Sequence, residues 1–263
     1  MDVYRFRFGR TPLLVSMPHA GTHVPADVAH DMTSEGREVP DTDWHMPELY
    51  DFLQELDATV LIGTHSRYVI DLNRPPDNRA LYVGSANTEL CPSTRFDNKP
   101  IWRPGCEPDP QTVHNRIERF WKPYHQALEN ALLRKRERFG YALLFEAHSI
   151  ASRVPRFFEG DLTDFNFGTN DGQSLPDAVA KRLLAIAQSQ PAYSSVLNGR
   201  FKGGYITRHY GRPAENLYAV QLELSQRTYM LENPPFKLDA GRAAQVRPLL
   251  RRILETYLAW SPL

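Results

Sequence analysis

Short apolar runs alternate along the chain with longer stretches in which apolar residues recur every three or four positions. The first pattern is typical of buried strands and the second of amphipathic helices. We predict strands at 12–18, 58–64, 68–72, 141–147, 195–198 and 219–225. The alternation of the two patterns favours an α/β fold, in which helices cover both faces of a largely parallel sheet.

The clearest helical pattern covers residues 111–139, where the apolar side chains share one face. Gly140 is expected to end this helix, and Pro123 is expected to kink it near the middle because proline removes a backbone donor. Ser174 is expected to cap a second helix, and a third is predicted from about 239 to 260.

Two long segments, 74–110 and 149–172, are rich in Gly, Pro, Asn and Asp and fit neither pattern. Loops of this length in compact domains usually form a lid or the wall of a binding site. The sequence shows no internal repeat, linker or charge run that divides it. We therefore expect residues 1–263 to form a single domain.

Composition and charge narrow the classes of protein further. Lys plus Arg and Asp plus Glu both total 31, so the chain lacks the basic field that a nucleic-acid partner requires. The apolar runs are far shorter than the roughly 18 residues of a membrane span, and the N-terminus lacks the pattern of a secretory signal. With only two cysteines, Cys91 and Cys106, we expect a soluble cytoplasmic protein without a disulfide framework.

Polar residues cluster at the carboxyl ends of several predicted strands. His19 follows the first strand, Asn73 and Arg74 follow the third, and His148 follows the fourth, while Glu223 lies within the last. In an open α/β sheet, ligands bind outside the carboxyl ends of the strands. A carboxylate on a central strand must also face a cavity or a cation, because an unpaired buried charge is costly. These residues are therefore the first candidates for a functional site.

Two histidines near carboxylates at Asp41, Asp43 and Glu223 offer enough nitrogen and oxygen ligands for a hydrolytic zinc site. Such a site leaves one position for a water whose pKa falls to about 7, and a nearby carboxylate can act as its base. Taken alone, each histidine could equally be a hydrogen-bonded structural residue. The motifs of serine hydrolases, P-loop proteins, dinucleotide-binding folds and thermolysin-like proteases are absent from the sequence.

Six separated motifs resemble those of the N-formylglutamate amidohydrolase family, also called N-formylglutamate deformylases. They are SMPHAGTHVP (16–25), DTDWHMPELYDF (41–52), SRYVIDLNRP (66–75), LLFEAHS (143–149), NGRFKGGYITRHYG (198–211) and QLELSQRTYM (221–230). The match extends over nearly the whole chain in the family's order. The last two motifs most resemble the branch that serves the last step of histidine catabolism.

The family in turn resembles the zinc carboxypeptidase and aspartoacylase fold, which implies a three-layer α/β/α sandwich with a central mixed sheet. Enzymes of that fold hold zinc through a His, a Glu three residues later and a second His. His19 and His148 match the two histidines, but position 22 is Thr22, so the third ligand must come from elsewhere. We expect Asp43 to supply it, with Asp41 and His45 as alternatives.

The same resemblance implies the other site residues. Asn73 and Arg74 match a pair that binds a substrate carboxylate, although a turn held by Asp71 would explain them structurally. Glu223 lies where the fold places its general base, and the alternative is a surface carboxylate on an edge strand. Arg67 and Arg208 are further candidates for carboxylate contacts, although each could form a structural salt bridge instead.

The resemblance implies that a metal-dependent enzyme hydrolyses N-formyl-L-glutamate to formate and L-glutamate, with one Zn²⁺ per chain. The same ligands also accept manganese, iron or cobalt. Two other functions remain open: an amidohydrolase for another N-acyl acidic amino acid, and a non-catalytic binder of an acidic metabolite. We expect a small-molecule substrate and no membrane partner, and the chain could be a monomer or a homodimer.

Overall fold

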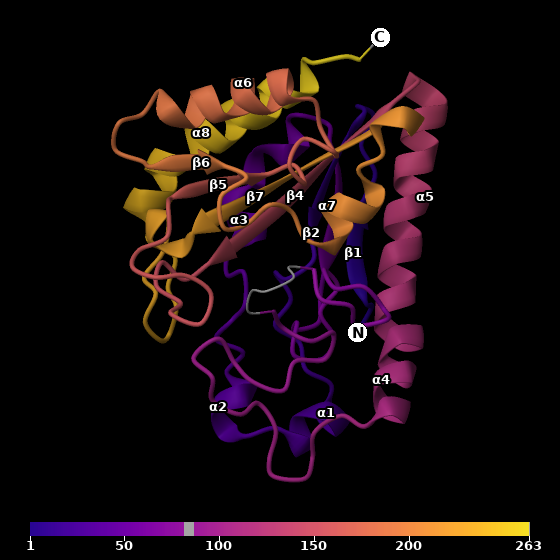
Figure 1. The fold of residues 1–263 in the computed structure, drawn as a ribbon, viewed down its shortest axis with the longest axis vertical. Helices are drawn as coiled ribbons and strands as arrows, with labels where there is room; N and C mark the ends of the chain where they lie inside the picture. Colours follow the sequence, from indigo (N-terminus) through magenta and orange to yellow (C-terminus); the bar gives the residue numbers. More distant parts are fainter. Residues whose placement is uncertain (82–86, 263) are drawn as a thin grey trace.

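A seven-stranded sheet runs through the centre of the molecule (Figure 1). The structure is a computed structural model that describes residues 1–81 and 87–262. The strands lie in the order β1-β3-β2-β4-β7-β5-β6. Their bounds are β1 Tyr4–Arg7, β2 Leu13–Met17, β3 Thr59–Gly63, β4 Ala142–Ile150, β5 Phe165–Gly168, β6 Ser195–Leu197 and β7 Leu217–Ser225.

The sheet is mixed. Strands β3, β2, β4 and β7 are parallel, whereas β1 is antiparallel to β3 and β5 is antiparallel to β7. The sheet expected from the family resemblance is thereby confirmed, and the largely parallel sheet expected from the alternation of patterns is corrected. Strand β6, which pairs with β5 in parallel, also runs against the central strands. Strands β1 and β5 are short segments that the apolar pattern did not reveal.

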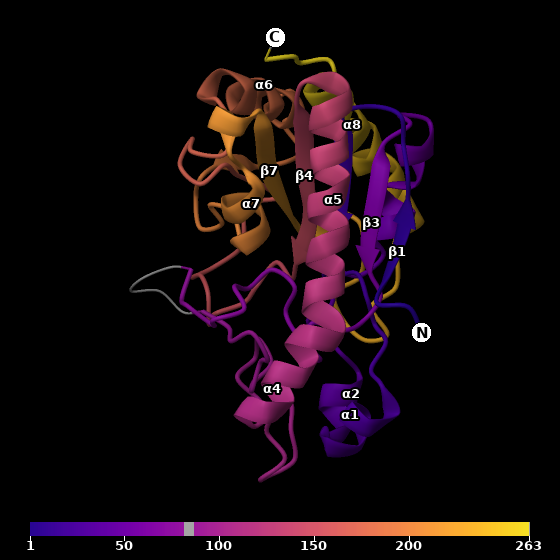
Figure 2. The same cartoon turned by 90° about the vertical axis from the view of Figure 1, so that its right-hand side faces the viewer.

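Helices cover both faces of the sheet (Figures 1 and 2). Helices α6 (Asp177–Gln188) and α8 (Ala240–Leu258) lie on one face, together with α3 (Met46–Leu49), and α5 (Lys122–Phe139) and α7 (Tyr205–Tyr210) lie on the other. The remaining helical segments are α1 Ala26–Asp31, α2 Ser34–Arg37, η1 Asp51–Gln54, α4 Pro110–Arg116, η2 Ile117–Trp121, η3 Pro213–Glu215 and η4 Gln226–Thr228.

Alternation along the central strands divides the core into two layers. In β4, Leu143, Phe145 and Ala147 pack on the side of α6 and α8, while Ala142 and Leu144 pack on the side of α5. Successive residues of a strand point to opposite faces, so Glu146 and His148 continue the α5 side of β4. The polar side chains therefore lie on one face, toward the carboxyl end of the strand.

The long helix predicted at 111–139 is present, with a break in its hydrogen-bond pattern. A π-turn, η2, connects α4 to α5, and the two helices are inclined to each other (Figure 2). This π-turn ends two residues before Pro123, so the predicted kink is confirmed and its form is a wider turn. Gly140 ends the helix with a φ of 83°, as predicted.

The other helix boundaries agree with the sequence except at one cap. Asp239 caps α8 by accepting a hydrogen bond from the backbone nitrogen of Arg242. Ser174 does not cap α6, whose N-cap is Pro176. The Ser174 hydroxyl instead donates to the backbone oxygen of Ala219, because it lies beside β7 rather than at the helix end.

One predicted strand is absent from the structure, and two observed strands were not predicted. Residues 68–72 form buried turns rather than a strand, while β1 and β5 were not predicted. The segment 149–172 thus contains the end of β4 and the strand β5, and the described part of 74–110 contains no helix or strand before α4. Phe96 and Phe157, one from each segment, line the same cavity, so both long loops contribute to its wall as expected.

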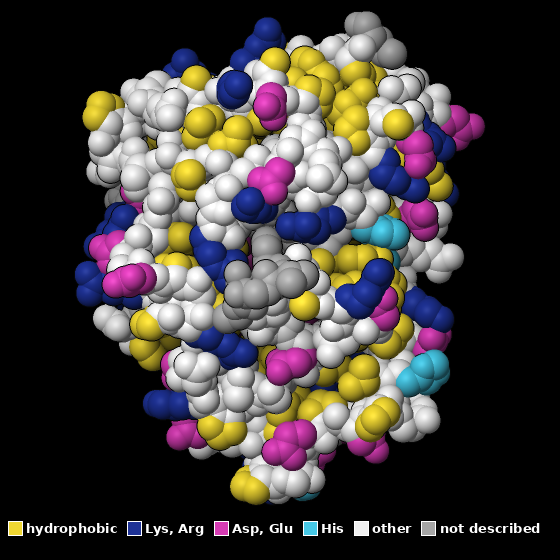
Figure 3. Space-filling view, viewed as in Figure 1, with side chains coloured by type: hydrophobic (Ala, Val, Ile, Leu, Met, Phe, Trp, Pro, Cys, Tyr) yellow, Lys and Arg dark blue, Asp and Glu magenta, His cyan; other side chains and the backbone are white. Residues whose placement is uncertain are grey.

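The structure also shows how the charged side chains are distributed and the state of the two cysteines. Positive and negative side chains are interspersed on the face shown in Figure 3 rather than gathered by sign. Cys91 and Cys106 are both free thiols. Among the described residues, no helix combines the length and apolar character needed to cross a membrane.

Candidate functional site

The carboxyl ends of three parallel strands bring the candidate residues together. His19 lies two residues beyond β2, while Glu146 and His148 lie on β4. In the register of β4 with β7, Glu146 is paired with Gln221 and His148 with Glu223. Side chains at paired positions share a face, so this register places four polar side chains on one floor.

His19, Asp43 and His148 form a buried cluster whose potential ligand atoms all lie within 4.8 Å of one another. The Oδ2 atom of Asp43 lies 2.9 Å from His148 Nδ1 and 3.9 Å from His19 Nδ1. Both Nδ1 atoms therefore face the same carboxylate oxygen. Two imidazole nitrogens and one carboxylate oxygen are a common donor set for a catalytic zinc ion, with one position left for water.

The far nitrogen of His19 is held by a buried ion pair. His19 Nε2 lies 2.7 Å from Asp71 Oδ1, and the other oxygen of Asp71 accepts a 2.6 Å hydrogen bond from Arg67. Burial raises the pKa of Asp71, but the neighbouring His19 and Arg67 hold it well below its usual range. A carboxylate that accepts the Nε2 proton leaves the Nδ1 lone pair of His19 toward Asp43, as in carboxylate–histidine–metal arrangements.

His148 lies in a more anionic environment than His19. Burial lowers the pKa of His148, but hydrogen bonds with Asp43 and Glu146 raise it overall to about 10. Burial and the charge of Arg67 instead lower the pKa of His19 to about 4. One imidazole is therefore neutral, and the other lies where positive charge is favoured.

The acidic groups around the cluster also fit a cation. The carboxylate of Glu146 is fully buried, with Oε2 3.3 Å from His148 Nε2, and its Oε1 has no hydrogen-bond partner among the described residues. Glu223 and Asp43 add two more buried carboxylates, with Arg67 at the edge of the group. A divalent cation at the three-residue cluster would offset this concentration of negative charge.

Glu223 lies at the floor of the cavity and not at an edge of the sheet. Its strand, β7, is flanked by β4 and β5, and the side chain is only 9% exposed. The alternative of a surface carboxylate on an edge strand is therefore wrong. Burial raises the pKa of Glu223, with Asp43 adding to the rise and the charge on His148 opposing it. A carboxylate with a raised pKa is suited to accept and return a proton near neutral pH.

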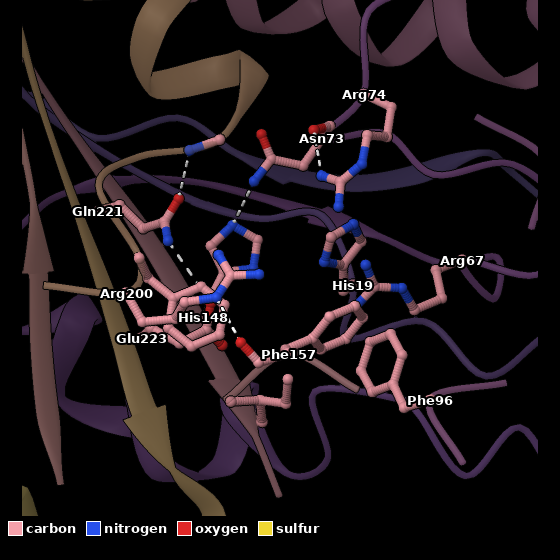
Figure 4. A pocket seen from close by; sticks show the side chains of 13 residues that line it. His19, Arg67, Asn73, Arg74, Phe96, His148, Phe157, Arg200, Gln221 and Glu223 are labelled. Atoms are coloured by element: carbon pink, nitrogen blue, oxygen red, sulfur yellow. Dashed lines mark hydrogen bonds between the residues drawn. The ribbon is translucent and has the colours of Figure 1, made fainter. Parts of the chain in front are cut away.

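Asn73 and Arg74 both line the cavity, and the turn that contains them is indeed held by Asp71. The backbone nitrogen of Asn73 donates to Asp71 Oδ1 at 2.8 Å. Asn73 Nδ2 lies 3.0 Å from His148 Nε2 (Figure 4). The structural explanation and the binding explanation are thus compatible, because the same turn that Asp71 stabilises presents both side chains to the cavity.

The cavity is bounded by polar groups on its floor and by aromatic rings and guanidinium groups on its walls. Arg67 and Arg74 lie on the same side of the labelled residues as His19, and Arg200 lies on the side of Glu223 (Figure 4). The lining residues are His19, Arg67, Asn73, Arg74, Phe96, His148, Ile150, Phe157, Arg200, Phe201, Gly204, Gln221 and Glu223. The wall thus carries three arginines, whose guanidinium groups suit the binding of carboxylates.

Arg200 lines the cavity although the sequence did not point to it, whereas the candidate Arg208 does not line this cavity. Arg200 belongs to the same motif as Arg208, and its Nε donates to the backbone oxygen of Phe157 at 2.6 Å. Arg208 lies on α7, and its Nε donates to the backbone oxygen of Gly203. The rings of Phe157 and Phe201 lie beneath the Arg200 guanidinium, a tertiary contact that no local sequence pattern indicates.

The two alternatives to Asp43 as third ligand have other partners. Asp41 accepts hydrogen bonds from the Tyr68 hydroxyl and the Phe96 backbone nitrogen. His45 lies between Glu48 and the backbone oxygen of Phe236, at 2.7 Å from each. Neither lies in the buried His–Asp–His cluster, whose carboxylate is Asp43.

Comparison with known proteins shows the family to which the chain belongs. Residues 11–230 match the family model described as N-formylglutamate amidohydrolase. The chain belongs to this family. It is 49% identical to the N-formylglutamate deformylase of Pseudomonas aeruginosa, with 99% of this chain and 97% of that protein covered. It is 48% identical to the N-formylglutamate deformylase of Pseudomonas putida, with 98% and 97% covered.

Two solved structures share this fold. The crystal structure of the Ralstonia eutropha N-formylglutamate amidohydrolase superposes with a TM-score of 0.79 at 26% identity, covering 98% of this chain and 96% of that one. A protein from Agrobacterium tumefaciens has a TM-score of 0.75 at 17% identity with the same coverage, and shows a likeness of fold alone. The family resemblance predicted from the six motifs is confirmed.

Proposed function

We propose that this protein is a metal-dependent N-formylglutamate deformylase that hydrolyses N-formyl-L-glutamate to formate and L-glutamate. The observation that carries the proposal is the buried His19–Asp43–His148 cluster beside Glu223, in a cavity that also presents three arginines. The near 49% identity to proteins named N-formylglutamate deformylase supports the same substrate. A cytoplasmic location and a role as the last step of histidine catabolism belong to this proposal.

His19, Asp43 and His148 would hold one Zn²⁺. A zinc ion in such a site acts as a Lewis acid toward a carbonyl oxygen and lowers the pKa of water to about 7. Asp71 fixes the tautomer of His19, and Glu146 lies beside the far nitrogen of His148. These outer carboxylates keep both Nδ1 atoms directed toward Asp43.

Glu223 acts as the general base and acid. Its raised pKa allows the carboxylate to take a proton from the attacking water and the resulting carboxylic acid to return that proton to the leaving nitrogen. The pairing of His148 with Glu223 across the strands places this carboxylate beside the candidate metal cluster. Breaking the amide bond then gives formate and the free amino group of glutamate.

The arginines and Asn73 recognise the two carboxylates of the substrate. Arg74 and Asn73 lie together on one turn, and in Figure 4 Arg74 lies on the side of His19 whereas Arg200 lies on the side of Glu223. Two separated anionic groups need separated cationic partners, because one guanidinium would leave the other carboxylate unpaired. Holding both ends orients the small formyl group toward the His–Asp–His cluster, and orientation supplies part of the rate.

Formate release from N-formyl-L-glutamate by the purified protein tests the proposal. We expect release that stops after chelation and returns when zinc is added. N-acetyl- and N-succinyl-L-glutamate at equal concentration test the substrate, and we expect slower hydrolysis of both. A folded protein that releases no formate with any divalent metal would refute the proposed reaction.

A further inference from the structure

The backbone that carries Asn73 and Arg74 is held by side chains of the long helix region. His125 Nε2 lies 2.9 Å from the backbone oxygen of Leu72, and Trp121 Nε1 donates to the backbone oxygen of Arg74 at 3.0 Å. The carbonyl between them, that of Asn73, accepts from the backbone nitrogen of Tyr205 at 3.3 Å. Three consecutive carbonyl groups are thus bound from α5, its preceding π-turn and α7.

The hydrogen-bond partners of His125 select one neutral tautomer of its ring. A backbone carbonyl can only accept, so Nε2 must carry the hydrogen that binds Leu72. Nδ1 is then an acceptor, and the Tyr210 hydroxyl lies 3.0 Å from it. Burial lowers the pKa of His125 to about 3, so the neutral ring keeps this pattern around neutral pH.

Trp121 and His125 also support each other. Their rings are stacked, with centroids 3.7 Å apart and planes inclined by 24°. The two residues are four positions apart, which places them on the same side of a helix. Trp121 is the last residue of the π-turn, and such turns change the direction of the side chains that follow. The departure from regular helix therefore coincides with the residues that bind the Leu72–Arg74 segment.

The side chain of Asn73 is also held in place by close contacts. Its Oδ1 accepts a 2.8 Å hydrogen bond from the Ile206 backbone nitrogen. A Cβ atom at Gly204 would lie 2.3 Å from Asn73 Nδ2, so no other residue fits there unless Asn73 moves. A shift of the segment would therefore displace the amide of Asn73 and the guanidinium of Arg74 together.

We propose that Trp121 and His125 are positioning residues for substrate binding, acting through the backbone of Leu72, Asn73 and Arg74. This inference rests on the proposed function for the identity of the ligand, an acidic amino acid. Neither side chain lines the cavity, so their effect on binding is indirect. Loss of either donor leaves a carbonyl of the segment unpaired and loosens both binding side chains.

Three variants test this inference in the zinc-loaded protein. Trp121→Phe keeps the aromatic ring and removes the N–H, His125→Leu removes the donor, and His125→Gln keeps a donor near the Nε2 position. For the first two we expect KM for N-formyl-L-glutamate to rise about tenfold with kcat within about twofold, the size of effect expected for a lost buried hydrogen bond. His125→Gln should recover most of the loss.

Calorimetric binding of L-glutamate provides a readout that does not depend on turnover. The affinity should fall by the same factor as KM rises, while zinc per chain stays unchanged. Tyr257→Phe is the matched control, because it removes a buried hydroxyl that donates to the Tyr218 backbone oxygen on the other face of the sheet. This control should leave KM and glutamate affinity unchanged.

The outcomes separate this inference from the proposed reaction. Glutamate affinity unchanged in Trp121→Phe and His125→Leu overturns the positioning role, whatever the activity. Equal losses in Tyr257→Phe, or a fall in kcat alone, overturn it as well. If the wild-type protein releases no formate but binds L-glutamate, and the two variants bind it more weakly, the reaction is refuted and the positioning role is supported. A wild-type protein that neither releases formate nor binds L-glutamate refutes both.

Discussion

His148 and Glu223 occupy paired positions on the adjacent parallel strands β4 and β7. The imidazole is one of three residues of the candidate metal cluster, and the carboxylate is the candidate base. Because the pairing is set by the backbone ladder of two central strands, the separation of these groups does not depend on a loop. This rigidity suits a proton transfer, in which small displacements are costly.

The cluster predicts which carboxylate is needed to bind zinc. Asp43→Ala should weaken zinc binding by at least about 100-fold, because a ligand is lost and not only an outer partner. Asp41→Asn should retain zinc, since Asp41 binds Tyr68 and the Phe96 backbone instead. Zinc per chain after dialysis measures both variants. A zinc-free Asp41→Asn protein that is still folded would contradict the assignment.

Glu223→Gln should separate catalysis from metal binding. The amide has nearly the same shape but cannot accept the proton, so we expect kcat to fall about 10²- to 10⁴-fold while zinc per chain is kept. Steady-state formate release and metal analysis of the same preparation give both values. Activity within tenfold of wild type would show that another group takes the proton.

The arginines make different predictions according to their positions. Arg74 lines the cavity, so Arg74→Met should raise KM for N-formyl-L-glutamate by at least about tenfold, as expected for a lost charged hydrogen bond. Arg208 lies outside the lining, and Arg208→Gln should change KM by less than about twofold. A larger effect of the Arg208 variant than of the Arg74 variant would reverse this assignment.

Burial of His125 should make the folded protein less stable at acid pH. Its pKa is about 3 in the folded protein and near 6.5 in the unfolded chain, so the unfolded state binds more protons between these values. The contribution of this neutral ring is present above about pH 6.5 and is lost as the pH falls toward 3. Urea unfolding at pH 7.5 and 5.0 should show a smaller loss of stability for His125→Gln than for wild type. An equal loss of stability in the two proteins would show that His125 does not contribute to the pH dependence.

Alternation along β4 and β7 is the part of the site that the sequence predicts best. In the run 220–225, polar residues alternate with apolar ones, and in the structure the apolar set lies in the core while Gln221 and Glu223 line the cavity. The metal cluster needed the family resemblance, because Asp43 lies 105 residues from His148 in the chain. No local pattern reports a contact over that distance.

The missed elements have physical causes of their own. Strand β1 exposes Phe6 and lies at the edge of the sheet, so its side chains do not show the pattern of a buried strand. The segment 68–72 is mostly apolar and buried, as a strand would be, but its backbone forms turns. Its one charged residue, Asp71, binds His19 and Arg67. Arg200 lies on a loop, where direction depends on tertiary contacts with Phe157.

The order of the site residues along the chain bears on the synthesis of the protein. His19, Asp43 and His148 all precede residue 149, whereas Gly204, Ile206 and Glu223 follow residue 200. A ribosome therefore completes the three candidate ligands well before it adds the carboxylate proposed to move the proton and the backbone that fixes Asn73. A nascent or truncated chain ending before α7 carries all three candidate ligands yet lacks both the proposed proton acceptor and the Ile206 backbone that fixes Asn73.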